Sequence, residues 1–222
     1  MLKDVYKVIL DKLGAKDVIF NKIPKINENR LSTGNSKLDK SILIFDLTAG
    51  KLGSCDRNCP KCYAIKAQVQ YSYTKLYRAI NFELAKNYSD YLERLITIQI
   101  NKTKSCKTVR IHSSGDFFSQ EYIDMWNRII KDFPTIKFYA YTKRIEQFDF
   151  TEICENSNFN MIDSFIEIDG KKYINYGTNK YVAFLVENGA FLCPATHKKW
   201  KGLCGKNCNY CMTQNKVCFH IH

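Results

Sequence analysis

Ten cysteines, and above all the spacing of six of them, most strongly constrain what this chain of 222 residues can fold into. Cys55-x3-Cys59-x2-Cys62 and Cys204-x3-Cys208-x2-Cys211 repeat one pattern in two distant parts of the sequence. An acidic residue, Asp4, comes early in the chain and no apolar signal segment follows it, so we expect a cytoplasmic location. Thiols in that reducing compartment bind metals more often than they pair as disulfides. The sequence therefore predicts two metal sites.

The first cysteine trio lies on one short loop that follows a predicted strand at residues 42–47. Three thiolates on one loop suit a [4Fe–4S] cluster, because each binds one iron and the fourth iron stays open to a ligand. Zinc ribbons prefer ligands in C-x2-C pairs, so zinc fits this loop less well. Cys55, Cys59 and Cys62 are therefore predicted to hold an iron–sulfur cluster.

The second trio has one further cysteine on each side, Cys193 upstream and Cys218 downstream. A fourth thiolate would close the coordination of a metal, and we predict that Cys193 supplies it. A closed site of Cys193, Cys204, Cys208 and Cys211 suits structural zinc or an auxiliary [4Fe–4S] cluster, and the sequence leaves both open. The isolated Cys106 and Cys154 are predicted to be core residues.

Strand-like and helix-like segments alternate over the first three quarters of the chain. Predicted strands cover residues 42–47, 108–112, 136–141 and 159–168, and predicted helices cover 2–13, 63–101 with a break near 87–89, 122–133 and 151–156. Alternation of this kind predicts parallel strands joined by crossovers, and four units are too few to close an eight-stranded barrel. We expect an α/β fold, either a partial (βα) barrel or an open, mostly parallel sheet.

Beyond residue 170 the pattern changes to short strand-like segments at 173–176, 181–186 and 190–192, joined by glycine-containing turns. We therefore predict two parts. Residues 1–170 form an N-terminal helix and the (βα) core, and residues 171–222 form a small Cys-rich extension packed on that core.

The chain is basic, with 34 Lys and Arg against 22 Asp and Glu and a net charge of +12. Residues 171–222 carry eight Lys and one acid, which is an excess of seven positive charges. This charge favours an anionic partner, and it fits a solvated basic surface equally well. A zinc-stabilised nucleic-acid-binding protein is accordingly the alternative function. No apolar run reaches the ~18–20 residues of a membrane span, so we expect no membrane partner.

With these motifs in place, the chain resembles the radical S-adenosylmethionine (SAM) superfamily, and within it a small phage-encoded branch. Cys55, Cys59 and Cys62 match that superfamily in spacing and in position after the first strand. Gly34-Asn35-Ser36-Lys37-Leu38, Cys59-Pro60, Cys193-Pro194-Ala195 and the final Cys-rich segment extend the resemblance over residues 33–220. It implies a [4Fe–4S] cluster whose open iron binds the amino and carboxylate groups of SAM. Lys61 departs from the pattern, since the superfamily usually has an aromatic residue there.

The residues that follow the other predicted strands also resemble the superfamily. Ser113-Ser114-Gly115-Asp116 is similar to the Gly-Gly-Glu motif that ends the second strand of the superfamily, which implies that Ser113, Ser114, Gly115 and Asp116 bind the SAM ammonium. Thr142 and Lys143 would meet the SAM carboxylate, and Asp163 and Ser164 the ribose. From pattern alone, residues 113–116 fit a helix-capping turn equally well, and the segment of Thr142 and Lys143 fits an exposed basic turn. His112 is a candidate substrate ligand by position, and a core histidine is an equal alternative.

The resemblance implies an enzyme that cleaves SAM reductively and uses the 5′-deoxyadenosyl radical on a small, nucleobase-like substrate. An electron donor such as flavodoxin or ferredoxin would be its partner. Among characterised families the chain is most similar to the queuine lyases, which cleave a C–N bond in queuine and release an aminomethyl-deazaguanine base for salvage. The sequence thus predicts a radical SAM lyase.

Overall fold

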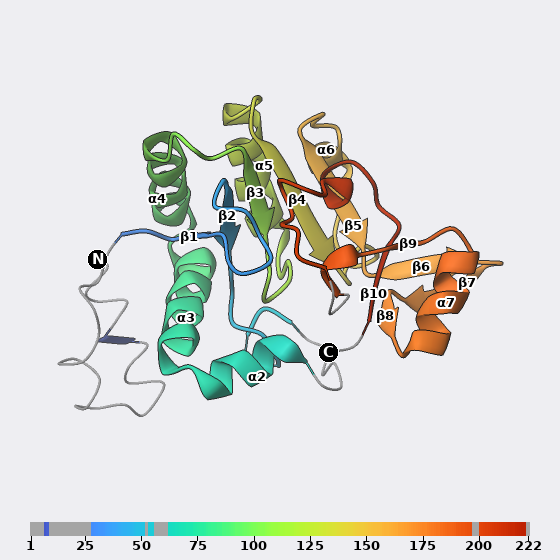
Figure 1. Cartoon of the computed structure of the whole chain (residues 1–222). Coiled ribbons are helices and arrows are strands. Elements are labelled where there is room, and N and C mark those ends of the chain that lie inside the picture. Colours follow the sequence, from blue (N-terminus) through green and yellow to red (C-terminus); the bar gives the residue numbers. More distant parts are fainter. Residues whose placement is uncertain (1–6, 9–27, 52, 56–61, 197–199, 221–222) are drawn as a thin grey trace. The chain divides into compact units, whose positions relative to one another are not determined.

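The fold is α/β with a mostly parallel sheet, as the sequence predicts (Figure 1). The computed structural model describes residues 7–8, 28–51, 53–55, 62–196 and 200–220. Five strands form the main sheet in the order β1-β2-β3-β4-β5: β1 (Ser32–Thr33), β2 (Ile42–Phe45), β3 (Thr108–Ile111), β4 (Lys137–Thr142) and β5 (Phe159–Asp163). The pairs β3–β4 and β4–β5 are parallel. Cys59 and nearly all of the predicted helix at residues 2–13 lie outside the described residues.

The helical stretch after the first cysteine loop contains three helices, where the sequence predicts two. They are α2 (Tyr63–Gln70), α3 (Ser72–Asn87) and α4 (Ser89–Lys102). The predicted break near 87–89 is confirmed at Tyr88. The additional break lies at Tyr71, whose backbone is extended (φ −124°, ψ 104°).

Two more helices follow in the crossovers of the main sheet. The helix α5 (Gln120–Asp132) has an apolar face that includes the buried Tyr122 and Trp126, and Pro134 follows its end. The short helix α6 (Thr151–Cys154) precedes β5. No helix in the described part of the chain is long and apolar enough to cross a membrane.

The chain divides into two compact units, each made of several stretches of sequence. Unit one comprises Met1–Ser32, Phe45–Lys104 and His112–Ile129, and unit two comprises Thr33–Ile44, Ser105–Ile111 and Ile130–His222. In unit one, the Phe45 ring packs edge-on against Trp126 at 5.3 Å between ring centroids. The predicted boundary after residue 170 falls inside unit two.

Unit two contains the parallel strands β3, β4 and β5, and the side chain of Asn158 fixes the turn that leads into β5. Its Nδ2 donates hydrogen bonds to the carbonyl oxygens of Ile130, Phe133 and Ile136 at 3.0–3.1 Å. A buried amide that satisfies three carbonyls stabilises a segment that has no regular backbone pairing of its own.

The predicted single strand at 159–168 is two strands, which corrects the sequence prediction. After β5 the carboxylate Oδ1 of Asp163 accepts a hydrogen bond from the Phe165 N–H at 2.9 Å, and the chain turns at Ser164. The strand β6 (Phe165–Ile168) then pairs with β7 (Lys171–Ile174) in a separate antiparallel hairpin. The hydrogen bond to the Asp163 side chain therefore ends β5 at this point, whereas strand propensity alone predicts that the strand continues.

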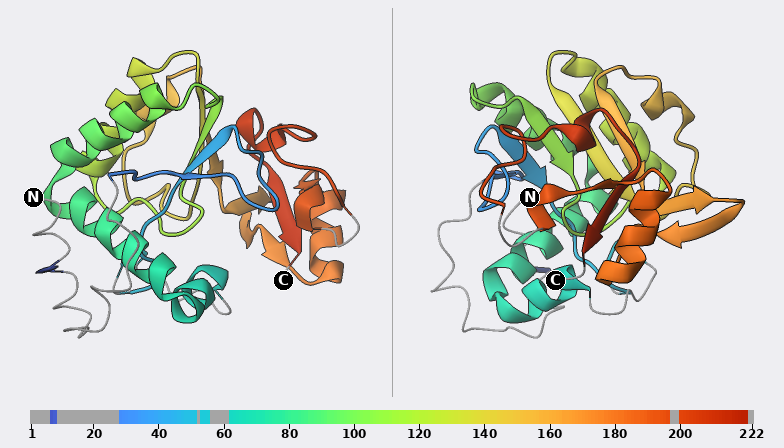
Figure 2. Two further views of the ribbon diagram at one scale, coloured as in Figure 1. Left: turned by 60° about the vertical axis from the view of Figure 1, so that its left-hand side comes forward. Right: turned by 45° about the vertical axis from the view of Figure 1, so that its right-hand side comes forward.

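The predicted strand at 181–186 is also wrong, because this segment lies within the helix α7 (Asn179–Glu187). Val182 and Leu185, three residues apart, are buried in an apolar cluster with Ile166, Ala190 and Cys218. The helix packs against β10 (Val217–His220), the central strand of a small sheet with β8 (Tyr176–Gly177) and β9 (Phe191–Leu192), as Figure 2 shows. Burial of one helical face outweighs the β propensity of Val, Phe and Tyr here.

Candidate functional site

The segments that follow β2 and β3 are hydrogen-bonded to each other in unit one. The His112 N–H donates to the Phe45 carbonyl, and the Leu47 N–H donates to the Ser114 carbonyl, both at 2.9 Å. The Ser114 hydroxyl returns a bond to the Leu47 carbonyl at 2.9 Å. The turn Ser113–Asp116 is therefore held against the segment that leads to the first cysteine loop.

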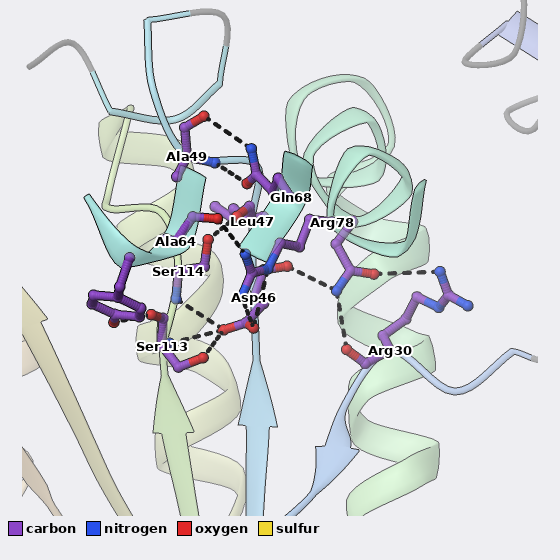
Figure 3. Close-up of polar contacts among 11 residues, drawn as sticks. Arg30, Asp46, Leu47, Ala49, Ala64, Gln68, Arg78, Ser113 and Ser114 are labelled. Atoms are coloured by element: carbon purple, nitrogen blue, oxygen red, sulfur yellow. Dashed lines mark hydrogen bonds and ion pairs between the residues drawn. The ribbon is translucent and has the colours of Figure 1, made fainter. Parts of the chain in front are cut away.

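Asp46 lies at the centre of this arrangement (Figure 3). Its Oδ1 accepts hydrogen bonds from the N–H groups of Ser113 and Ser114 at 2.9 Å and from the Ser113 hydroxyl at 2.6 Å. Its Oδ2 accepts bonds from the Arg78 Nη2 at 3.1 Å and Nε at 3.3 Å, and Arg78 Nη1 donates to the Ala64 carbonyl at 3.0 Å. One carboxylate thus connects the turn to α3 and, through Arg78, to α2.

Asp46 and Arg78 are not among the site residues that the sequence predicts. Asp46 directly follows the four buried residues of β2, and Arg78 lies between the buried Leu76 and Ile80 on α3. Two features of the sequence could have pointed to this pair. One is a charged residue next to a buried strand, and the other is a charged residue on the apolar face of a helix, because buried charges are paired. Pattern alone shows neither that the two meet nor what they bind.

The amide of Gln68 on α2 extends the same network toward the first cysteine loop. Its Oε1 accepts a hydrogen bond from the Ala49 N–H at 2.7 Å, and its Nε2 donates to the Ala49 carbonyl at 3.4 Å (Figure 3). Both backbone groups of Ala49 are therefore satisfied by one side chain.

The residues next to Cys55 and Cys62 both contact the Ser113–Asp116 turn. Ser54 Oγ accepts a hydrogen bond from the Asp116 N–H at 3.0 Å, and the Tyr63 hydroxyl donates to the Ser113 carbonyl. Cys55 and Cys62 themselves are half-buried. The structure therefore brings two of the three predicted cluster ligands and the turn into one part of unit one.

Gly115 allows the close approach of the turn to the cysteine loop. Its φ is +89°, a conformation that residues with a side chain rarely adopt. A Cβ at this position would lie 2.5 Å from the Ser54 Oγ and 2.7 Å from the Leu47 Cβ. Only glycine fits between the two segments without displacing one of them.

His112 and Asp116 flank this turn and are both buried. The carboxylate Oδ1 of Asp116 accepts a hydrogen bond from the Phe117 N–H at 2.9 Å. The His112 ring lies edge-on to Phe117 at 4.8 Å, and its Nε2 is 2.8 Å from the Tyr122 hydroxyl. Burial holds the pKa of Tyr122 well above its usual range, so the hydroxyl stays protonated. This aromatic setting favours the core role for His112 of the two that the sequence left open.

In unit two, the residues expected to bind the SAM carboxylate and ribose come together at the carboxyl ends of β4 and β5. Thr142 and Asp163 are register partners, and the Ser164 N–H donates to the Thr142 carbonyl at 2.7 Å. Burial raises the pKa of the Asp163 carboxyl, while the nearby cations of Lys172 and Lys143 oppose that rise. The four predicted residues Thr142, Lys143, Asp163 and Ser164 thus share one strand-end region.

The second cysteine set lies in unit two, after β9 and beside the main sheet. Burial, together with the charges of Cys211, Cys204 and Cys208, raises the pKa of Cys193 to about 12. Burial and the charges of Cys211 and Cys208 raise the pKa of Cys204 to about 11. Cys193 therefore lies close enough to Cys211, Cys204 and Cys208 for their charges to act on it. Within the described ranges, no group of three or more His, Cys, Asp or Glu side chains is arranged as a ready metal site.

The remaining cysteines have separate environments. Cys218 is fully buried in the apolar cluster of α7 and β10, which supports Cys193 as the fourth member of the second set. Cys106 is half-buried before β3. Cys154 is exposed, so its prediction as a core residue is wrong. The helix α6 is a single turn in which Ile153 is the buried residue, and Cys154 follows it on a different side of the turn.

Fold and sites together define an α/β protein with a mostly parallel sheet and two cysteine-bearing loops. The sequence profile of the Gene product 88 family matches residues 21–219, and the chain belongs to this family.

Curated relatives match a shorter part of the chain. The Gene 88 protein of Mycobacterium phage D29 is 32% identical over 102 residues, which cover 39% of this chain and 42% of the relative. The Gene 88 protein of Mycobacterium phage L5 is 32% identical over 102 residues, covering 39% of this chain and 43% of that protein. The match thus spans less than half the length of these relatives. No solved structure matches the chain significantly.

Proposed function

We propose that this protein is a radical SAM enzyme whose [4Fe–4S] cluster is held by Cys55, Cys59 and Cys62. One observation carries the proposal: both ends of the cysteine loop are hydrogen-bonded to the Ser113–Asp116 turn. Ser54 makes this contact before Cys55, and Tyr63 makes it after Cys62. In the superfamily that the sequence resembles, the corresponding loop and turn bind the cluster and the SAM ammonium.

The residues present fit these two ligands chemically. Three thiols on one loop match a cluster with one open iron, and Cys55 and Cys62 are half-buried. Asp116 supplies a buried carboxylate, and a carboxylate binds an ammonium group through a strong, charge-assisted hydrogen bond. The cradle at Gly115, which a Cβ would fill, keeps the turn in contact with the loop. Asp46 and Arg78 hold the turn in place before any ligand binds.

The strand order supports the partial barrel of the superfamily as the fold. The strands β2, β3, β4 and β5 are neighbours in the same order as in the sequence. Successive parallel units wound in one direction give this order in (βα) barrels, whereas doubly wound sheets reverse direction at a switch point. Thr142, Lys143, Asp163 and Ser164 stay predictions as ligands of the SAM carboxylate and ribose, resting on the resemblance.

Held by Cys55, Cys59 and Cys62, a reduced [4Fe–4S] cluster would supply the electron for the reductive cleavage of SAM. The chain's own contribution is to bind the SAM ammonium at Asp116 and to keep water from the turn with the aromatic residues behind it. A small, nucleobase-like substrate is proposed from the resemblance to queuine lyases, with cleavage of a C–N bond as the reaction. A flavodoxin- or ferredoxin-like protein is the proposed electron donor.

Anaerobic reconstitution of the full chain with iron and sulfide tests this proposal. We expect an oxygen-sensitive brown chromophore, and 5′-deoxyadenosine after addition of SAM and dithionite. Cys62→Ser removes one ligand and abolishes 5′-deoxyadenosine formation, whereas Cys154→Ser, at an exposed and isolated thiol, retains it.

The proposal is rejected if the reconstituted wild-type chain forms neither the chromophore nor 5′-deoxyadenosine. Elemental analysis that finds zinc alone, together with RNA binding that weakens steeply with salt, would instead support the nucleic-acid-binding alternative.

A further inference from the structure

The segment between β9 and β10 has little regular structure to hold it in place. Its described residues form only two single-turn 3-10 helices, at Pro194–Thr196 and Tyr210–Met212. Almost all of its described side chains are half-buried or exposed rather than buried. Long segments without regular structure are uncommon in compact domains. Small parts of a protein that bury little apolar surface are commonly stabilised by disulfides or by a structural metal.

Backbone and ring contacts bring the four cysteines of this segment together. Phe191 and Tyr210 stack face to face at 3.9 Å between ring centroids, which brings the segments that carry Cys193 and Cys211 side by side. Cys204 and Cys208 form a β-bridge, and the Gly205 N–H donates to the Cys208 carbonyl at 2.9 Å. The segment with Cys193 therefore contacts the segment with Cys211, and Cys204 is paired with Cys208.

The same segment is attached to the main sheet of unit two at two points. Cys204 and Met212 both pack against the apolar cluster of Leu38, Ile42 and Ile44. The Asn160 Nδ2 on β5 donates to the Cys211 carbonyl at 3.0 Å. The thiols therefore lie between the irregular segment and the sheet.

Two residues of the sheet face these thiols with the chemistry that a bound thiolate needs. The Tyr141 hydroxyl on β4 donates a hydrogen bond to the Cys211 Sγ at 2.8 Å. The Arg110 guanidinium on β3 lies 5.6 Å from the centre of the Tyr141 ring, which places a positive charge beside the residue that donates to Cys211. Hydrogen bonds to ligand sulfur and nearby charge are the usual outer-shell features of metal–thiolate sites.

We propose that Cys193, Cys204, Cys208 and Cys211 bind one metal centre, zinc or a [4Fe–4S] cluster, which holds residues 193–196 and 200–216 on the sheet of unit two. Four thiolates close the coordination, so the centre is structural rather than a reaction site. This inference does not depend on the radical SAM chemistry proposed for the first cysteine loop.

Cysteine alkylation on the wild-type chain tests the site without any variant. The full chain is purified anaerobically, loaded with zinc or with iron and sulfide, desalted, treated with iodoacetamide under native conditions and mapped by mass spectrometry. We expect Cys193, Cys204, Cys208 and Cys211 to react at least about tenfold more slowly than the exposed Cys154, and to become reactive together after chelation. Reaction of the four at the rate of Cys154 in the loaded protein, or no retention of metal, overturns the proposal.

Metal content of variants identifies the metal and separates this site from the first. Cys193→Ser and Cys211→Ser are expected to lose about one zinc or about four irons per chain, depending on which metal the site holds. Cys218→Ser, a buried thiol outside the set, keeps the wild-type content. Unchanged metal content in both Cys193→Ser and Cys211→Ser contradicts the assignment. Formation of 5′-deoxyadenosine is not the readout, so the two proposals fail separately.

Discussion

At the scale of single residues, Asp46 organises the candidate site in unit one through hydrogen bonds on both carboxylate oxygens. Asp46→Asn replaces one oxygen by an NH2 group and leaves Arg78 or the turn without its acceptor. We expect a loss of about 3–5 kcal/mol in the free energy of unfolding, as for other broken buried ion pairs. Urea denaturation measures it.

The matched control for Asp46 is Glu93→Gln, which breaks the ion pair with Arg128 on the surface of unit one. Because the Arg128 side chain is half-exposed, this change should cost less than about 1 kcal/mol. Equal losses in the two variants would show that Asp46 does not have the organising role assigned to it.

Gly115 offers a second test at this scale, because its backbone strain and its close contacts can be separated. Gly189 has nearly the same φ, +87° against +89°, but a Cβ there would meet nothing within 4 Å. Gly189→Ala should therefore cost only the strain of a positive φ, about 1–2 kcal/mol. Gly115→Ala should cost about 1–3 kcal/mol more, since its Cβ overlaps Ser54 and Leu47, and it should lower 5′-deoxyadenosine formation.

Thermal unfolding of the two glycine variants measures the difference, and the product assay follows on the folded protein. If Gly115→Ala is no less stable than Gly189→Ala and equally active, the turn and the cysteine loop do not need their close approach.

At the scale of elements, the burial pattern of the α7 segment distinguishes a helix from a strand. In a strand Val182 and Leu185, three residues apart, would point to opposite faces, whereas in the helix they share the buried face. Leu185→Ala removes a fully buried side chain and should cost about 2–5 kcal/mol. Val186→Ala, at an exposed position, should change stability by less than about 0.5 kcal/mol.

Chemical denaturation followed by circular dichroism compares these two variants. A large loss of stability for Val186→Ala, with little effect of Leu185→Ala, would show that this segment is the strand that the sequence predicts.

At the scale of the whole molecule, neither unit is one continuous stretch of sequence. In unit two, residues near the start and the end of the chain are directly bonded. The Cys204 N–H donates to the Lys37 carbonyl, and the Asp39 N–H donates to the Cys204 carbonyl, both at 2.9 Å. We therefore expect a fragment of residues 1–170 to lose cooperative thermal unfolding, although the sequence predicts a core over those residues.

Calorimetry of the fragment and the full chain decides this point. A cooperative transition of the fragment near the melting temperature of the full chain would establish residues 1–170 as an independent domain.

Local patterns were sufficient for much of the fold and for the candidate ligands. The alternation of strand and helix predicted β2 to β5 and the helices between them, because each of these elements buries one periodic face. Cysteine spacing alone singled out both candidate ligand sets. These features depend on residues that are close in the sequence, whereas the contacts of Ser54 and Tyr63 with the turn at Ser113–Asp116 join residues 62 and 50 positions apart.

The sequence by itself therefore determined the α/β class, the positions of the parallel strands and the two sets of thiols. Only the tertiary structure decided that residues 181–186 are helical, that the strand after Phe159 ends at Asp163, and that Asp46 pairs with Arg78. It also separated Cys218, which packs in an apolar cluster, from the four thiols that lie near one another. The physical reason is distance along the chain: propensity and spacing act between near neighbours, whereas burial and ion pairing join residues that only folding brings together.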